Sequence, residues 1–254
     1  MSQNNHPTVL TLPNIRLKDE RTVFFLDFFR LLMSWKLRGH IEQLYVQNMT
    51  LTQEVDIETG AVLAPNHISR WDASLFLTLS EHIGKRAFVF VPHTILAQFP
   101  FLRWCGAIPL YTEYPSQAIA QLKQTHKLSE EPTQFWIFPQ GQYRPPHLPS
   151  LRFKEGATIL ANHVEYPVIP VAIQYLYRDS KKPTAYISFR PPLPYHCSVN
   201  DIEGSVKRGL KEIDQFHLGK PDDRFVPLYK RNPNKEHLST RILTWFSSWK
   251  LGKV

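Results

Sequence analysis

A histidine and an aspartate, His67 and Asp72, lie five positions apart directly after the apolar run Ala61–Pro65. A neutral imidazole can accept a proton from a hydroxyl group, and a neighbouring carboxylate can orient the ring and stabilise the imidazolium that forms. The two side chains could therefore work as a general base and its orienting partner. Aspartate is also a common N-cap, and a two-residue pattern recurs by chance. Alone, the spacing favours a loop histidine followed by a capped helix.

Three further stretches follow this pair along the chain and make the pattern more specific. They are WCGAIPLYT (104–112), IFPQGQYRP (137–145), and FKEGATILA (153–161) with VIPVAI (168–173). In this order, and with Asn66 directly before His67, the stretches resemble the four motifs of the glycerolipid acyltransferase family, of the bacterial 1-acylglycerol-3-phosphate type. The resemblance covers roughly residues 50–195 of the chain.

The resemblance implies an O-acyltransferase. His67 would take the proton of an acceptor hydroxyl, which attacks the thioester of acyl-CoA or acyl carrier protein, and Asp72 would orient His67. It implies no metal and no cofactor beyond this co-substrate. Backbone N–H groups near Gly141 are candidates for binding the oxyanion, because glycine permits a close backbone approach. The implied substrate-binding residues are Asn66, Gly106, Tyr111, Phe138, Pro139, Gln140, Gly141, Gln142, Arg144, Lys154 and Pro170.

Several positions depart from the family's usual residues, and they bear on the acceptor. The third motif is usually Phe-Pro-Glu-Gly-Thr-Arg, but the glutamate, threonine and arginine positions hold Gln140, Gln142 and Tyr143, and Arg144 follows one residue late. In the second motif, Tyr111 stands near the end of the strand, where an arginine is usual. Arginine forks bind phosphate strongly, whereas these residues offer neutral hydrogen bonds.

Two acceptors therefore stay open. One is a lysophospholipid of the 1-acylglycerol-3-phosphate class, and the other is a hydroxyl of an uncharged glycolipid or glycosylated terpenoid such as a carotenoid. A third hypothesis, from a different class, is a non-catalytic lipid-binding protein on the same fold. It is disfavoured because such a protein has no reason to keep both His67 and Asp72.

Charge and composition limit the partners. The 254 residues carry a formal net charge of +8, with 30 Lys and Arg against 22 Asp and Glu. This charge favours anionic lipids, and because the basic residues are spread along the chain we expect no nucleic-acid binding. Two cysteines argue against a disulfide framework. No signal peptide is recognisable, and the longest charge-free stretch, 87–102, is interrupted by prolines and too short for a span. We therefore expect a peripheral or monotopic protein on the cytoplasmic face of the cell membrane.

The elements that must position His67 and Asp72 follow from hydrophobic periodicity. The pattern predicts an α/β fold with a mixed, largely parallel sheet flanked by helices, and open sheets of this kind place their sites at strand ends. The predicted strands are 61–65, 87–91, 107–112, 134–138, 168–176 and 184–190, the last two forming a hairpin. The predicted helices are 72–83, 93–104, 116–127, 156–163 and 206–217.

The two ends of the chain differ from this alternation. Residues 21–46 predict a very apolar helix with one narrow polar stripe of Asp27, Arg30, Ser34 and Arg38, which either lies in a lipid interface or docks on the core. A C-terminal helix is predicted with one apolar face of Leu238, Ile242, Trp245 and Trp249. We expect a disordered lead with the apolar helix over 1–50, a catalytic domain over 51–218, and a basic extension over 219–254 that begins with a linker or wrapped loop over 219–235.

Overall fold

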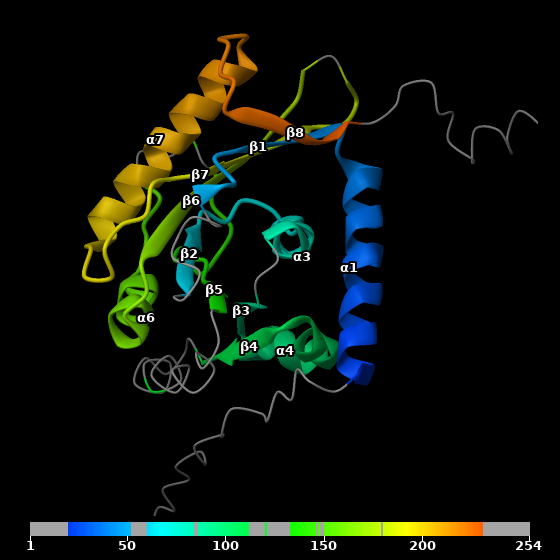
Figure 1. Ribbon diagram of the computed structural model, residues 1–254, viewed down its shortest axis with the longest axis vertical. Coiled ribbons are helices and arrows are strands. Elements are labelled where there is room, and N and C mark those ends of the chain that lie inside the picture. Colours follow the sequence, from blue (N-terminus) through cyan, green and yellow to red (C-terminus); the bar gives the residue numbers. More distant parts are fainter. Residues whose placement is uncertain are drawn as a thin grey trace, which may run out of the picture.

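The computed structural model describes residues 20–51, 60–83, 86–111, 120, 133–145, 147, 150–178 and 180–230. Their strands form one sheet and are β1 (Gln43–Gln47), β2 (Ala61–Pro65), β3 (Arg86–Pro92), β4 (Ala107–Leu110), β5 (Thr133–Trp136), β6 (Val168–Leu176), β7 (Thr184–Phe189) and β8 (Phe225–Lys230). The order across the sheet is β4-β3-β5-β2-β6-β7-β1-β8 (Figure 1).

Most of the sheet is parallel. Strands β4, β3, β5, β2 and β6 run in one direction, and β7 returns antiparallel to β6 as the predicted hairpin. Strand β1 is parallel to β7, and β8 closes the edge antiparallel to β1. The predicted mixed, largely parallel sheet is confirmed.

Helices cover both faces of the sheet (Figure 1). Helix α3 (Asp72–Ile83) lies on one face, with α1 (Glu20–His40) packed against it, and α6 (Gly156–Val164) and α7 (Val199–His217) lie on the other. Helix α4 (His93–Gln98) and the 3-10 helix η1 (Pro100–Cys105) connect β3 to β4. Because both faces are covered, a central parallel strand reads as a continuous apolar run.

Strand β2 shows how the core fixes the start of the site. All five of its residues are buried. Leu63 packs in the cluster on the α3 side, and Val62 and Ala64 pack in the cluster on the α6 side, as the period of two requires. The carboxyl end of β2, after which His67 follows, is therefore held from both faces.

The N-terminal helix is shorter than predicted. It ends at His40, whose Nδ1 lies 2.8 Å from the carbonyl oxygen of Lys36, and the chain then enters β1, which the prediction had placed in the helix. Gly39 in the last turn weakens the helix, and the alternation of buried Leu44 and Val46 with half-buried Gln43 and Tyr45 fits a strand.

The segment 219–235, predicted as a linker or wrapped loop, contains strand β8. This strand lies at the sheet edge, where Pro227 is tolerated and Val226 is exposed, so it lacks the apolar alternation of a buried strand. Strands β1 and β8 both lie outside the predicted 51–218 range, and the sheet therefore extends beyond the expected catalytic domain.

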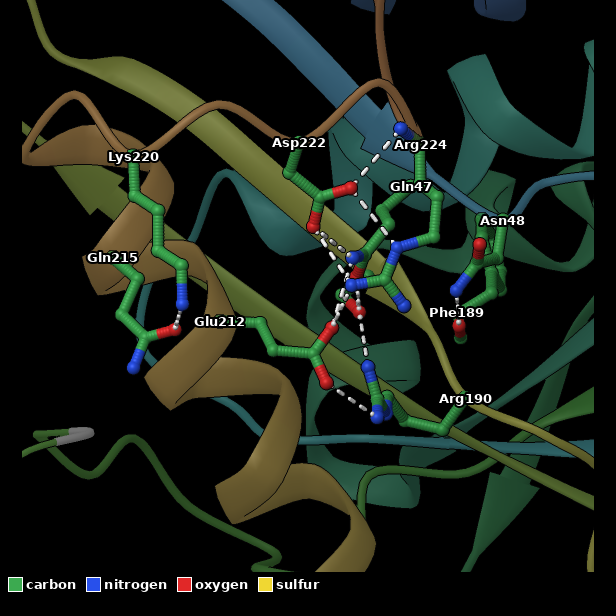
Figure 2. A network of polar contacts seen from close by, with 10 residues as sticks. Gln47, Asn48, Phe189, Arg190, Glu212, Gln215, Lys220, Asp222 and Arg224 are labelled. Atoms are coloured by element: carbon green, nitrogen blue, oxygen red, sulfur yellow. Dashed lines mark hydrogen bonds and ion pairs between the residues drawn. The ribbon is translucent and has the colours of Figure 1, made fainter.

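A polar network explains why this edge is part of the fold (Figure 2). Gln47 of β1 donates to Glu212 of α7 (2.9 Å) and to Asp222 before β8 (3.1 Å). Arg190 after β7 binds Glu212 at 2.9 Å, and Arg224 binds both Glu212 (3.0 Å) and Asp222 (2.8 Å). Burial acts to raise the pKa of Glu212, but hydrogen bonds from Arg190 and Gln47 outweigh it and hold that pKa below its usual value.

Other element boundaries also differ from the prediction. The predicted helix 93–104 is broken at Phe99, because Pro100 has no N–H and restricts the residue before it. Helix α7 starts seven residues before the predicted Val206, where Ser198 and Asp201 form a capping box. Strands β4 and β5 end at Leu110 and Trp136, two residues before their predicted ends. The lead 1–19, the predicted helix 116–127 apart from residue 120, and the predicted C-terminal helix lie outside the described residues.

Candidate active site

His67 and Asp72 are in direct contact in the loop between β2 and α3. His67 Nδ1 lies 2.7 Å from Asp72 Oδ2, and the side chain of Asp72 is completely buried whereas that of His67 is 20% exposed. One nitrogen of the imidazole is thus held by the carboxylate. The other, Nε2, is the nitrogen that can exchange a proton with a bound molecule.

The carboxylate of Asp72 also organises the loop. Its Oδ2 accepts hydrogen bonds from the backbone N–H groups of Ile68 (2.9 Å) and Ser69 (3.0 Å). Its Oδ1 accepts a hydrogen bond from the hydroxyl of Tyr175 on β6 (2.9 Å). Burial, and then the charge of Asp72, raises the pKa of Tyr175 well above its ordinary value, so this hydroxyl stays protonated and donates. One side chain thus both orders the helix entry and holds the imidazole.

Asn66 anchors the other end of the loop. It is completely buried, its amide donates to the carbonyl oxygen of Ile173 (3.0 Å), and its amide oxygen accepts from the N–H of Ile173 (2.7 Å). This two-bond contact replaces a backbone pair and fixes the loop against β6. The side chain of Asn66 is therefore used inside the protein, bonded to the backbone of Ile173.

The loop after β5 supplies two aromatic rings. The ring centroids of Phe138 and Tyr143 each lie 4.3 Å from that of His67. Tyr143 is 57% exposed, and its pKa is raised, first by burial and then by the charge of Asp72, while Arg70 opposes the shift. The imidazole is therefore flanked by two aromatic rings, of which that of Tyr143 is exposed at the protein surface.

Gln140 holds two segments of the site together. It is buried, its amide oxygen accepts from the backbone N–H of His67, and its amide nitrogen donates to the carbonyl oxygen of Leu151 (3.0 Å). Both ends of the amide are used inside the protein. At this position the side chain needs a donor and an acceptor at once, which an ionised carboxylate does not offer.

Replacing Gln140 with glutamate, the family's usual residue, is therefore expected to destabilise this protein by about 1–3 kcal/mol. A carboxylate oxygen would face the carbonyl oxygen of Leu151 in a buried place. Protonation restores the donor, and burial raises a carboxyl pKa, so the deficit should be smaller near pH 5 than near pH 8. Denaturant unfolding at about these two pH values measures the difference.

The matched control is Gln142→Glu in the same loop, where the side chain is exposed and little change is expected. Equal stability of Gln140→Glu and wild type at the higher pH would contradict the assigned hydrogen bonds.

The turn at Gly141 differs in part from the expectation. Gly141 has φ +66, a left-handed conformation that favours glycine, and a Cβ there would lie 3.5 Å from Lys154 Nζ. Its N–H donates to the carbonyl oxygen of Phe138 (3.1 Å), and the N–H of Arg144 donates to that of His67 (2.8 Å). These two N–H groups are engaged within the protein and are not free to bind an oxyanion, so the expectation of oxyanion donors near Gly141 stays a prediction for the other N–H groups of the turn.

Two cationic side chains lie in this part of the site. Arg144 is half-buried, and in the amide orientation that pairs donors with acceptors, the oxygen of Gln142 accepts from its Nε (3.2 Å) and Nη2 (2.6 Å). Lys154 is exposed, and its backbone N–H donates to the carbonyl oxygen of Pro139 (3.0 Å), which ties it to the same turn.

Other predicted substrate-binding residues lie in the framework. Gly106 ends η1 with φ +80, and a Cβ there would lie 2.7 Å from the carbonyl oxygen of Ala87. Pro170 is buried in β6, paired with Ala64. Tyr111 follows β4 and stacks on His93, with centroids 4.3 Å apart. The structure thus brings His67, Asp72 and the third motif together, whereas Gly106 lies between η1 and β4 and Pro170 lies within β6.

Tyr175 is the residue of the site that the sequence did not reveal. Tyr175 lies two residues after Ile173 on β6, so its side chain is expected on the same face of the sheet, the α3 face. No local pattern in the sequence indicates its hydrogen bond to Asp72.

Comparisons with known proteins agree with this fold. A family model described as Acyltransferase matches residues 43–174, just over half of the chain. The chain therefore belongs to the acyltransferase family, as its motifs predicted, and it is an acyltransferase, not a non-catalytic lipid-binding protein.

Among solved structures, the crystal structure of the 1-acyl-sn-glycerophosphate (LPA) acyltransferase PlsC from Thermotoga maritima is similar, with a TM-score of 0.56 and 17% identity. The match covers 79% of this chain and 84% of that chain. At this identity the likeness concerns the fold. A comparison with curated protein sequences finds no match.

Proposed function

We propose that the protein transfers a fatty acyl group from an acyl thioester to a hydroxyl of a lipid acceptor, with His67 as general base and Asp72 as its orienting partner. The observation that carries the proposal is the 2.7 Å contact between His67 Nδ1 and the buried carboxylate of Asp72. This contact favours the tautomer that leaves Nε2 able to accept a proton.

The chemistry needs no covalent enzyme intermediate. His67 Nε2 takes the proton of the acceptor hydroxyl while its oxygen attacks the thioester carbonyl carbon. The carbon–sulfur bond of the tetrahedral intermediate then breaks, and the leaving thiolate receives a proton from the imidazolium. The donor class is acyl-CoA or acyl carrier protein, and Asp72 stabilises the imidazolium between the two steps.

The first acceptor candidate is a lysophospholipid of the 1-acylglycerol-3-phosphate class. Arg144 and Lys154 beside the third-motif turn support it, because their charges suit a phosphate. The structurally similar PlsC is named as an LPA acyltransferase, in line with this candidate.

The second acceptor candidate is an uncharged sugar hydroxyl of a glycolipid or glycosylated terpenoid. Tyr143 favours it, because a half-exposed ring flanks His67 where the family has an arginine. Such a ring can pack against the apolar face of a sugar.

An acyl-transfer assay with purified protein tests both candidates. Labelled acyl-CoA and labelled acyl carrier protein are each offered with 1-acylglycerol-3-phosphate or with a neutral glycosylated lipid, in detergent micelles. A product with the phosphorylated acceptor supports the first candidate, and a product with the glycosylated lipid alone supports the second. No product with any pairing contradicts the proposal.

We also propose that the protein works on the cytoplasmic face of a membrane and contacts anionic lipids through α1. Among the described helices, none is long and apolar enough to cross a bilayer. In α1, however, polar Ser34 is buried against Thr78 (3.1 Å), while Phe28, Leu31 and Trp35 are 51%, 72% and 69% exposed. A helix whose outer face meets only water buries its apolar side chains and exposes its polar ones, whereas here a polar side chain is buried and three apolar ones are exposed.

The exposed apolar surface continues beyond α1. Phe29 stacks on Phe101 of η1 with centroids 5.0 Å apart, and Ile95 and Phe99 of the neighbouring segment are also exposed. Apolar side chains on two adjacent elements suit insertion into the acyl boundary of a bilayer.

The double variant Leu31→Glu/Trp35→Glu is expected to lower the affinity for vesicles containing anionic phospholipid by about tenfold or more. Sedimentation with vesicles measures the binding. The control is Leu218→Glu after α7, where an even more exposed leucine lies outside the proposed surface. Unchanged binding of the double variant would rule out α1 as the contact.

A further inference from the structure

We propose that Tyr175 is a positioning residue of this enzyme: its hydroxyl fixes the rotation of the Asp72 carboxylate so that Oδ2 is presented to His67. The inference rests on the proposed function, in which His67 is the base. It concerns a residue three motifs away from His67 along the chain, at a sequence separation of 103 from Asp72.

The two oxygens of Asp72 have separate tasks. Oδ2 is the oxygen in contact with His67 Nδ1, and it also accepts the backbone N–H groups of Ile68 and Ser69. Oδ1 accepts the Tyr175 hydroxyl at 2.9 Å, and the described part of the chain provides it with no other donor. A carboxylate with donors on one oxygen alone can rock about its Cβ–Cγ bond, whereas a donor on each oxygen fixes the plane.

The sheet makes this donor rigid. Val171 and Ile173 of β6 pack in the cluster on the α3 side, and Tyr175 continues the same face two residues later, half-buried against that cluster. Strand β6 is paired with β2 over Val168–Val171 and with β7 over Val171–Leu176, and Tyr175 itself is paired with Ala185 of β7. The phenol therefore approaches Asp72 from a fixed strand, not from a surface loop.

The same strand also holds the other end of the catalytic loop. Ile173 binds Asn66 through both its N–H and its carbonyl oxygen, at 2.7 and 3.0 Å. Two residues further, Tyr175 binds Asp72. Since Asn66 precedes His67 and Asp72 ends the loop, β6 sets the positions of both flanks of the base.

A phenol suits this task better than a carboxyl or an imidazole. Its proton stays in place because burial and the neighbouring carboxylate oppose ionisation. The phenol therefore remains a hydrogen-bond donor to Asp72 and adds no charge beside the imidazole.

Tyr175→Phe tests the inference by removing one oxygen atom. The expected result is a fall in kcat of about tenfold with KM for both substrates within about twofold, because only the transition state needs the fixed carboxylate. Tyr186→Phe is the matched control. Tyr186 lies on the adjacent strand β7, is buried, and bonds His217 (3.0 Å) on the α7 side, so its variant should keep wild-type kcat.

A double-mutant cycle with Asp72→Ala separates positioning from a general structural effect. If Tyr175 acts through Asp72, then Tyr175→Phe costs nothing further in the Asp72→Ala background, whereas independent losses multiply. Melting curves of every variant accompany the assay, and if Asp72→Ala does not fold, the kcat–KM split of Tyr175→Phe decides. Wild-type kcat in Tyr175→Phe, a loss confined to KM, or multiplying losses in the cycle would each overturn the inference. Activity retained by His67→Ala would instead refute the proposed base, so the two failures are distinguishable.

Discussion

Replacing His67 with alanine is expected to lower kcat/KM by about 100- to 10,000-fold, the range that a positioned general base contributes. Without the imidazole, the acceptor hydroxyl must lose its proton to water during attack. The binding surfaces for donor and acceptor remain, so KM should change little. Initial rates of acyl transfer, measured against the concentrations of both substrates, check the result.

The structure predicts that this variant stays folded. The backbone N–H of His67 bonds Gln140 and its carbonyl oxygen accepts from Arg144, and neither bond needs the side chain. Asp72 keeps the N–H groups of Ile68 and Ser69 and the hydroxyl of Tyr175, so no buried charge is left without donors. A large loss of activity with an unchanged melting temperature is therefore the expected combination.

His196→Ala is the control for this prediction. His196 is exposed and lies before α7, where its ring contacts only the ring of Tyr195 among the described residues (centroids 5.1 Å apart). Its replacement should leave the rate unchanged. Wild-type turnover of His67→Ala would refute the mechanism whatever the acceptor is.

The sequence was a good guide to elements that are defined locally. Strand β2 and helix α3 were predicted at their observed bounds, because an unbroken apolar run and an amphipathic period are local signals. The hairpin of β6 and β7 was also predicted, since both strands are apolar and a polar turn joins them. Strand β8 was missed because it contains Pro227 and lies exposed at an edge, so neither an apolar run nor an alternating period marks it.

Apart from Tyr175, the residues that meet at the candidate site could be predicted, but their hydrogen bonds could not. Motif order placed His67, Asp72 and Gln140 in one site, and the structure brings them together. The hydrogen bonds of Gln140 to His67 and to Leu151 join residues 73 and 11 positions apart. The hydrogen bond from Tyr175 to Asp72 joins residues 103 positions apart. Such contacts depend on how β2, β5 and β6 are ordered in the sheet, which no local pattern contains.

Asp72 also shows why the sequence left two hypotheses open. As an N-cap it was expected to order the start of α3, and as a catalytic partner it was expected to hold His67. In the structure Asp72 is the first residue of α3, and its Oδ2 accepts the N–H groups of the preceding Ile68 and Ser69, so it ties the loop to the helix start without being the N-cap that the spacing suggested. The same Oδ2 contacts His67, and the two tasks differ in what they require of the charge: binding the loop N–H groups needs only an acceptor, whereas a partner of an imidazolium needs a negative charge.

Asp72→Asn separates these requirements and is expected to lower kcat by about 100- to 10,000-fold without unfolding the protein. The amide oxygen can keep the Oδ2 position, because the N–H groups of Ile68 and Ser69 and the Nδ1–H of His67 all need an acceptor there. The amide nitrogen would then face Tyr175, whose phenol oxygen can accept. The orientation of the imidazole and the bonds from the loop N–H groups are preserved, and only the charge opposite the imidazolium is lost. Single-turnover rates of acyl transfer, together with the melting temperature, measure the two effects separately.

Asp201→Asn is the matched control, since Asp201 also binds at a helix start, in the capping box of α7 with Ser198, and lies outside the site. Its replacement should leave the rate of acyl transfer at the wild-type value. If Asp72→Asn kept wild-type turnover while Asp72→Ala lost its fold, Asp72 would only hold the loop before α3 in place. His67 would then have to act without a charged partner, because no other carboxylate among the described residues contacts its ring. A large loss in a folded Asp72→Asn variant instead means that the negative charge of the buried carboxylate, and not merely its hydrogen bonds, supports the proton transfer.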